Sequence, residues 1–287
     1  MVGGCKEMKL CWLCYMDGRF LPAEEARLPV TDLIIQRGIG VFEVIATYRG
    51  RPLMLTSHLE RLMASAASSR IRPPLTMEKM KEIVREGIAL ALPDVEDELQ
   101  VKVYLSGGDA FDSEKGFTAP RFFVIFEELS LPPQGLYERG AVLEPVPAGR
   151  DNPTVKSVDY RTSYSLSRRN ALEVLYCPGG EITESAHSSF FLVLGGVLIT
   201  APLSRVLNGT ARAAVIELAR LDGLTVEERP PLLSELPRAE EAFITGSVKK
   251  VMPVTQIGDQ IIGDGRPGPV TLRLSELYLR RLDEWLE

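Results

Sequence analysis

The chain has 287 residues, of which 45% are hydrophobic and 25% are charged, and its formal net charge is -6. These proportions are ordinary for a globular protein, and the acidic balance argues against a nucleic-acid-binding protein, which would carry a basic surface. Membrane insertion is also disfavoured, because no apolar run approaches the roughly 18 residues that a spanning helix needs. Asp17 and Arg19 interrupt the N-terminal stretch, so it lacks a clear signal sequence. We therefore expect a cytoplasmic protein.

The first half of the chain alternates strand and helix patterns. Residues 12–21 predict a hairpin that turns at Asp17-Gly18, and a β-rich run follows over residues 41–48. Apolar residues at helical spacing predict two helices over about 57–69 and 76–90, the second with Thr76 as its N-cap. Residues 101–105 and 122–126 have the composition of buried strands.

Four cysteines, Cys5, Cys11, Cys14 and Cys177, are too few for a disulfide framework in a chain of this length. Cys11 and Cys14 form a CxxC pair, but neither a second pair nor a nearby histidine completes a metal site. The alternation of Trp12, Cys14 and Met16 instead predicts a strand in which cysteine acts as a small hydrophobic residue. We expect no metal ligand here.

The best candidate for a domain boundary is the stretch 127–140, which contains Pro132-Pro133-Gln134-Gly135. We predict a smaller N-terminal α/β domain over residues 1–127, a linker over 128–140 and a C-terminal domain over 141–287. The second half should contain a strand at 141–146 and helices over about 163–171, 211–221 and 270–287. Mixed strands and helices in two halves predict an α+β or α/β architecture typical of enzymes.

The stretch around Lys156 most narrows the function of this chain. Val155 and Val158 flank the lysine, which predicts a buried strand end. Loss of hydration at such a place lowers the pKa of a lysine and leaves a usable neutral amine. Tyr160 follows four residues later and could reach the same site. Because most lysines are solvated surface groups, this hypothesis depends on partners further along the chain.

Three further segments supply such partners. Glu184 begins a run of small residues, Gly209 precedes a helix whose N–H groups can bind phosphate, and Ser247 ends a strand in a Thr-Gly-Ser turn. Each feature is common by itself. Together, a lysine, a tyrosine, a carboxylate and two anion cups are the set that pyridoxal 5'-phosphate requires, since the lysine forms the Schiff base and the carboxylate keeps the ring nitrogen protonated.

The ordered set of segments resembles the class IV aminotransferases, the fold-type IV pyridoxal-phosphate enzymes. This group includes branched-chain aminotransferases, D-amino acid aminotransferases and aminodeoxychorismate lyases. The resemblance extends from about Tyr15 to Leu277 and implies a two-domain homodimer with a barrel-like sheet in its larger domain. It rests on these segments: Gly40-Val41-Phe42-Glu43, His58-Leu59-Glu60-Arg61-Leu62, Val155-Lys156-Ser157 with Tyr160, Ile182-Thr183-Glu184, Asn208-Gly209, Phe243-Ile244-Thr245-Gly246-Ser247, Pro253-Val254 and Gly265-Arg266-Pro267-Gly268-Pro269.

The resemblance implies a role for each matching residue. Lys156 would form the Schiff base and Glu184 would partner the pyridine nitrogen. Arg61 would bind the phosphate, and Tyr160 would hydrogen-bond near the ring oxygen. The phosphate cup would be completed by Gly209, Thr210, Ala211 and Ser247. For the substrate pocket the candidates are Phe42 and Arg37, the latter because the pocket otherwise lacks an evident cation.

Several positions depart from the family pattern. Ala211 stands where threonine is common, Ser189 replaces an asparagine, and Ile39 breaks a Gly-Asp-Gly. The strand over residues 102–108 also lacks the arginine that many members use for a substrate carboxylate. These departures affect the substrate pocket more than the cofactor site.

The leading hypothesis is an aminotransferase that moves an amino group between an amino acid, of the branched-chain or D-amino acid type, and a 2-oxo acid. An aminodeoxychorismate lyase that releases pyruvate is an alternative, because Asn208-Gly209 favours it slightly whereas the missing Gly-Asp-Gly disfavours it. A protein that binds the cofactor without turnover is the third hypothesis.

Overall fold

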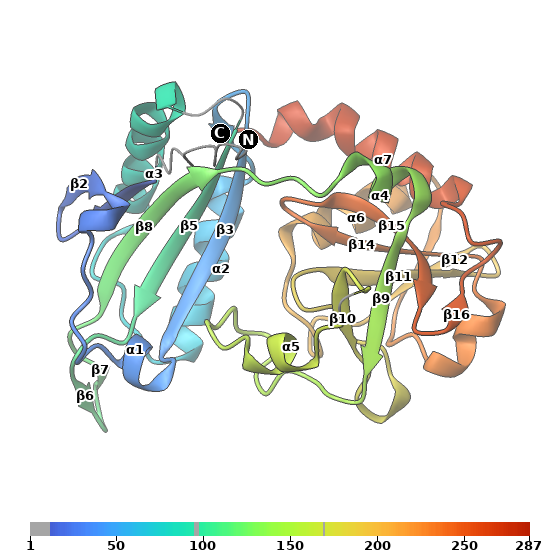
Figure 1. Ribbon diagram of the computed structural model, residues 1–287, viewed down its shortest axis with the longest axis horizontal. Helices are drawn as coiled ribbons and strands as arrows, with labels where there is room; N and C mark the ends of the chain where they lie inside the picture. Colours follow the sequence, from blue (N-terminus) through green and yellow to red (C-terminus); the bar gives the residue numbers. More distant parts are fainter. Residues whose placement is uncertain (1–11, 95–97, 169) are drawn as a thin grey trace, which may run out of the picture.

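Two β-sheets form the framework of the molecule (Figure 1). The computed structural model describes residues 12–94, 98–168 and 170–287. The first sheet is antiparallel throughout and has the strand order β2-β1-β8-β5-β3-β4. Its strands are β1 (Leu13–Met16), β2 (Arg19–Pro22), β3 (Gly40–Tyr48), β4 (Arg51–Pro52), β5 (Leu99–Ser106) and β8 (Arg121–Glu128).

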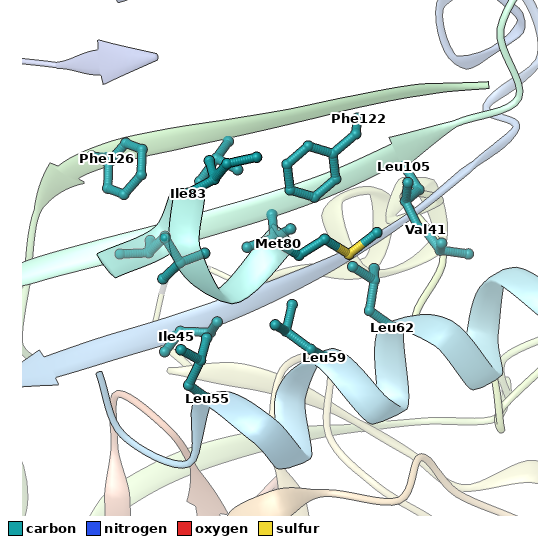
Figure 2. Packing of buried hydrophobic residues seen from close by; sticks show 14 of the residues in the cluster. Val41, Ile45, Leu55, Leu59, Leu62, Met80, Ile83, Leu105, Phe122 and Phe126 are labelled. Atoms are coloured by element: carbon teal, nitrogen blue, oxygen red, sulfur yellow. The ribbon is translucent and has the colours of Figure 1, made fainter. Parts of the chain in front are cut away.

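Two helices pack against one face of this sheet, α2 (Leu55–Ser68) and α3 (Met77–Ala91) (Figure 1). On α2, Leu55, Leu59 and Leu62 recur at helical spacing and are fully buried against β3 and β5, as Figure 2 shows. Each buried leucine contributes about 2 kcal/mol of hydrophobic stabilisation. Thr76 caps α3 as predicted, since its hydroxyl accepts the Lys79 N–H at 3.3 Å. Both predicted helices are confirmed, with α2 beginning two residues early.

The predicted N-terminal hairpin is formed by β1 and β2. Asp17 and Gly18 both have positive φ, as the two-residue turns that match strand twist require. Cys14 and Met16 point into the interior, and burial raises the pKa of the Cys14 thiol to about 11. Cys5 and Cys11 lie outside the described residues. Within those residues no cluster of His, Cys, Asp and Glu has metal-binding geometry.

The second sheet is mixed and has the order β10-β9-β15-β14-β11-β12-β13, with β16 paired to β15. The pairs β9–β10, β9–β15 and β12–β13 are parallel and the others are antiparallel. One face packs against α6 (Thr210–Leu221) and α7 (Pro269–Arg281). The strands are β9 (Ala141–Val146), β10 (Glu173–Tyr176), β11 (Ser189–Leu194), β12 (Val197–Thr200), β13 (Thr225–Glu228), β14 (Glu241–Gly246), β15 (Lys250–Ile257) and β16 (Gln260–Ile261).

Short elements connect these layers. They are α1 (Leu33–Arg37), α4 (Gln134–Arg139), α5 (Arg161–Leu166) and the strand pair β6 (Phe111–Asp112) and β7 (Gly116–Phe117). Helix α4 lies inside the stretch predicted as a linker, and the domain boundaries stay a prediction. In the part of the chain that the structure describes, every helix is too short or too polar to cross a membrane.

Two helix predictions were wrong at their ends. The helix predicted over 163–171 is α5, which ends at Leu166, because the hydroxyls of Ser163 and Ser167 donate to the backbone carbonyls of Tyr160 and Ser163. Such local hydrogen bonds compete with helix formation. The helix predicted over 270–287 ends at Arg281 and is followed by a 3-10 turn. The chain then turns back to the start of α2, where the Met54 N–H donates to the Trp285 carbonyl at 2.8 Å.

The segment that carries Lys156 is attached to the edge of the first sheet. Strand β4 pairs only with Thr47 and Tyr48 at one end of β3. At the other end, the Phe42 N–H donates to the Lys156 carbonyl at 3.0 Å, and the Val158 N–H donates to the Gly40 carbonyl at 3.1 Å. Residues 156–158 therefore continue the sheet edge that β4 leaves open.

Candidate active site

A cavity of about 700 Å³ lies where segments of both sheets meet. Strand alternation explains its wall on the first sheet. Val41, Ile45 and the odd-numbered residues of β5 face the helices. The cavity is lined by Phe42 and Val44 of β3 and by Gln100, Lys102 and Tyr104 of β5. The predicted residues that line it are Phe42, Arg61, Lys156, Tyr160, Glu184, Gly209, Thr210, Ala211 and Ser247.

Lys156 is held by its backbone and has a weakly basic amine. Its N–H donates to Ser65 Oγ at 3.2 Å, and its Nζ lies 4.8 Å from the centre of the Phe42 ring. Burial lowers the pKa of Lys156 to about 8, with the positive charges of Arg61 and Arg150 acting in the same direction. A substantial fraction of this amine is therefore neutral near physiological pH, as a nucleophile or general base requires.

Glu184 is buried and both of its carboxylate oxygens accept hydrogen bonds. Oε1 accepts from Arg150 at 3.1 Å, and Oε2 accepts from the Leu207 N–H at 3.2 Å. Burial raises the pKa of Glu184, although the charge of Arg150 opposes this shift. A carboxylate with a raised pKa is a good partner for a group that shares a proton, such as a ring N–H. Arg150 was not predicted, because it lies in a loop of turn-forming residues without any local pattern.

Arg61 reaches the cavity from α2 as one member of a buried cluster. Its Nε and Nη2 donate to the two oxygens of Glu43 at 2.7 and 2.6 Å. Nδ1 of His58 lies 2.7 Å from Glu43 Oε2, and both Glu43 and His58 have no exposed surface. Burial alone would raise the pKa of Glu43, but the charge and hydrogen bonds of Arg61 and the hydrogen bond of His58 hold it at about 2. Glu43 and His58 belong to the segments that carry the family resemblance, but no role was predicted for either residue.

The N-terminus of α6 and the turn after β14 meet at the same end of the cavity. Gly209, the N-cap of α6, has no side chain to cap the first helical N–H groups, so they are available to an anion. Ser247 Oγ lies 3.5 Å from Thr210 Oγ1, and Arg61 Nη1 donates to the Asn208 carbonyl at 2.9 Å. The buried Thr245 hydroxyl in this wall has no partner among the described residues. These groups form an anion cup.

A third buried carboxylate, Glu173, was not predicted. It accepts hydrogen bonds from the hydroxyls of Ser185 and Ser188, and from the His187 N–H at 3.0 Å. Lys249 Nζ lies 2.6 Å from its Oε1. Glu173 therefore connects the loop that follows Glu184 with the turn that follows Ser247. No signal in the sequence pointed to it, because its partners lie far along the chain.

Aromatic rings line the remaining wall. Phe42 packs edge-on to Tyr160 at 5.8 Å and stacks on Tyr104 at 5.5 Å, while Tyr160 stacks on the His187 ring at 4.9 Å. Burial raises the pKa of Tyr160 to about 12, so its hydroxyl stays protonated and can donate a hydrogen bond. Phe42 and Tyr160 are thus brought together with Lys156.

The structure does not bring Arg37 to this site. Arg37 is exposed at the end of α1, is absent from the cavity wall, and donates to the Gln36 carbonyl at 2.9 Å. Within one chain, its predicted contact with a substrate carboxylate is therefore unsupported. Lys102 on β5 is a cation that does line the cavity, where it pairs with Glu127.

The departures from the family pattern are accommodated by packing. Ala211 is buried in the apolar core beneath α6. Ser189 lies at the start of β11 close to Gly209, where an added Cβ would approach Ser189 Oγ to 2.8 Å. A larger residue at position 209 would therefore require the Ser189 hydroxyl to move.

Comparison with known proteins agrees with this geometry. The family model "Amino-transferase class IV" matches residues 40–257. A putative branched-chain-amino-acid aminotransferase of Methanocaldococcus jannaschii is 32% identical over 94% of this chain and 96% of its own length. A D-alanine aminotransferase of Listeria monocytogenes is 25% identical over 93% and 95% of the two chains.

Solved structures show the same fold. A branched-chain amino acid aminotransferase from T.th., solved with pyridoxamine 5'-phosphate, superimposes with a TM-score of 0.86. It is 26% identical, and the match covers 96% of this chain and 97% of that one. The predicted fold-type IV architecture is confirmed. The chain belongs to amino-transferase class IV and is an aminotransferase.

Proposed function

We propose that the chain uses pyridoxal 5'-phosphate to move an amino group between a small amino acid and a 2-oxo acid. The observation that carries this proposal is the meeting of a lysine of lowered pKa, a buried glutamate and an anion cup in one cavity. Each of these groups is supplied by a different segment. A structural ion pair alone would not require all of them to face the same space.

The donor set fits the cofactor. Lys156 would hold it covalently, Glu184 would accept a hydrogen bond from its ring nitrogen, and Tyr160 would donate to its ring oxygen. Arg61 and the first N–H groups of α6 would hold its phosphate, with Thr210 and Ser247 beside them. When bound, pyridoxal phosphate supplies an electron sink for negative charge at the substrate α-carbon.

The side chains of this chain would transfer the proton of the substrate α-carbon. Once released from its covalent bond, Lys156 Nζ is the base that would remove the proton from the substrate Cα. A pKa of about 8 keeps a useful fraction of this amine neutral. Arg150 and the Leu207 N–H would hold the Glu184 carboxylate in place, since each binds one of its oxygens.

For the substrate we propose that Lys102, rather than Arg37, supplies the cation for a carboxylate. Lys102 lines the cavity two residues from Tyr104, so a carboxylate on Lys102 would place the substrate beside the Phe42 and Tyr104 rings. This wall suits an apolar side chain, as in the branched-chain and D-alanine types named for the relatives. Lys102→Met should raise KM by about tenfold or more with little change in kcat, whereas Arg37→Met should leave KM unchanged.

We also propose that residues 1–127 and 141–287 fold as separate domains and that the protein is cytoplasmic.

We further propose that the chain works as a homodimer. Leu131 and Tyr164 support the dimer, because both line the cavity although they are 52% and 76% exposed. A second copy would cover them and complete the cavity wall. Light scattering of the purified protein tests this, since a monomer at working concentration would contradict it.

The first experiment is the absorption spectrum of the cofactor-loaded protein during addition of single L- and D-amino acids. Conversion of the pyridoxal band to the pyridoxamine band identifies the donor and its handedness. Lys156→Ala should abolish the conversion. Lys79→Ala, which changes an exposed lysine on α3, is the matched control and should convert at the wild-type rate. Conversion by the Lys156→Ala protein at a comparable rate would refute the assignment.

A further inference from the structure

His58 has a different partner on each ring nitrogen, and the assigned roles explain neither contact. Its Nδ1 lies 2.7 Å from Glu43 Oε2, and its Nε2 lies 3.0 Å from Ser247 Oγ and 3.4 Å from Thr210 Oγ1. The ring therefore connects a buried carboxylate with the two hydroxyls of the anion cup. Which atom carries each hydrogen can be deduced from this geometry.

The charge state of Glu43 determines whether His58 Nδ1 carries a hydrogen. Glu43 is ionised, because the charge and hydrogen bonds of Arg61 together with the hydrogen bond of His58 outweigh burial and hold its pKa at about 2. An ionised carboxylate only accepts hydrogen bonds, so His58 Nδ1 must carry the hydrogen. Arg61 Nη2 also lies 3.4 Å from Nδ1, but it donates to Glu43 at 2.6 Å, and the carboxylate oxygen is the nearer neighbour of Nδ1.

The second nitrogen must then be an acceptor. Burial lowers the pKa of His58, and the nearby charges of Arg61 and Lys156 lower it further, whereas Glu43 opposes them. The neutral ring with a hydrogen on Nδ1 has a lone pair on Nε2. Of the two hydroxyls near this lone pair, Ser247 is the closer and would donate its hydrogen there.

We propose that Glu43 is a positioning residue that fixes His58 as the Nδ1–H tautomer, so that His58 draws the Ser247 hydroxyl hydrogen away from the anion cup. Ser247 then presents only lone pairs to the cup. An anion there is held instead by Arg61, by backbone N–H groups and by the Thr210 hydroxyl, which His58 leaves free. This revises the role predicted for Ser247, and only the identity of the anion as a phosphate ester rests on the proposed function.

The tautomer can be observed directly by NMR. The chain has only two histidines, so multiple-bond 15N–1H spectra of the cofactor-free protein contain two ring systems, and a His187→Gln variant assigns them. We expect a neutral His58 with its hydrogen on Nδ1 between about pH 7 and pH 8, because its pKa is lowered from the ordinary value of 6.5. A hydrogen on Nε2, or a doubly protonated ring in this range, would overturn the proposal.

Two variants separate positioning from a purely structural role. Glu43→Gln should give a mixture of His58 tautomers, because a carboxamide both donates and accepts. Ser247→Ala keeps Glu43 and should leave the tautomer unchanged, so the proposal remains testable even if Glu43→Gln does not fold. Loss of the Nδ1–H form in Ser247→Ala, or its full retention in Glu43→Gln, would count against Glu43 as its cause.

Binding measurements test the consequence for the cup. For the cofactor-free protein, Ser247→Ala should weaken inorganic phosphate and pyridoxal 5'-phosphate by less than about threefold, whereas loss of a hydrogen bond to a charged ligand costs about tenfold or more. A loss of that larger size would show that the Ser247 hydroxyl donates to the anion, contrary to the proposal. If the wild-type protein bound neither ligand, the proposed function would fail, while the NMR result would still decide the tautomer.

Discussion

Two buried glutamates stand behind the walls of the same cavity and hold different kinds of partner. Glu43 binds two ionisable side chains, Arg61 and His58, from a single helix. Glu173 binds one cation, Lys249, and otherwise two hydroxyls and a backbone N–H from a loop. The pKa of each carboxylate would rise on burial, but its partners lower it.

The difference teaches what each carboxylate fixes. Glu43 orients the charged Arg61 side chain, which reaches into the cavity, and the neutral His58 ring behind it, so its loss would change the electrostatics of the anion cup. Glu173 fixes backbone, since its partners are neighbours in the loop after Glu184 and in the turn after Ser247. Its loss would change the shape of the site. Two kinds of experiment can distinguish these two roles: replacing the partners of each glutamate, and measuring stability as a function of pH.

The largest effect is expected from Arg61→Met. It leaves the Glu43 carboxylate buried with only a neutral histidine, and removing one partner of a buried ion pair costs about 3–5 kcal/mol of unfolding free energy. Urea denaturation of the cofactor-free protein measures this. The control is Arg280→Met, which breaks an exposed pair with Glu276 and should cost less than about 0.5 kcal/mol. Equal losses in the two variants would contradict a special role for the Glu43 cluster.

The next largest effect is the loss of unfolding free energy at low pH, where the Glu43 carboxylate becomes protonated. Its pKa falls from an ordinary value of 4.5 to about 2 on folding, so its stabilising contribution is present above about pH 4.5 and is lost as the pH falls toward 2. By linkage the loss amounts to about 3 kcal/mol. Unfolding free energies of the wild type and Glu43→Gln, measured between these pH values, should converge as the pH falls. Parallel curves would show that Glu43 does not titrate in this window.

Glu173→Gln should have a smaller effect, about 2 kcal/mol, because only one of its four partners is charged and glutamine keeps one acceptor oxygen. Most of this loss reflects the Lys249 ammonium left without a counter-charge. The double variant Glu173→Gln with Lys249→Met should therefore recover part of the stability in thermal unfolding. If the double variant loses the sum of both single effects, the ion pair is not the main contribution.

Replacing Lys156 should have the smallest effect on the unfolding free energy, and the effect should be a gain. Among the described residues, no carboxylate lies within ion-pair distance of its amine. Its pKa is lowered from 10.5 to about 8, so the folded cofactor-free protein is destabilised below about pH 8 and gains stability as the pH rises toward 10.5. Lys156→Met should stabilise the protein by about 1–2 kcal/mol at pH 7, less than the full shift implies because the side chain is only partly buried. This gain should shrink by pH 10.

The sequence predicted those features that depend on local pattern. The hairpin at Asp17-Gly18, the cap at Thr76 and the apolar spacing of α2 follow from neighbouring residues. The order of short motifs also grouped Lys156, Glu184 and Arg61 in one site, and the three line the same cavity, while their roles stay a prediction.

Features that depend on contacts between distant segments were not predicted. Arg150 and Glu173 lie in stretches without periodicity and gain their importance from Glu184 and Lys249, which are 34 and 76 residues away. Arg37 was predicted from the apparent lack of a cation, whereas strand alternation directs Lys102 toward the cavity. The end of α7 likewise depends on contacts with the start of α2.

The pairing of residues 156–158 with the edge of β3 has a consequence for how the site assembles. Lys156 belongs to the second half of the chain, but the first sheet, which the first half forms, holds its backbone in place. A chain divided between the last strand of the first sheet, β8, and the first strand of the second, β9, would leave Arg61 on one fragment and Lys156 on the other. Each fragment would then lack part of the residue set proposed to bind the cofactor, and co-expression of the two would regenerate the cavity only where that edge forms again. The enzyme is thereby suited to conversion into a split reporter.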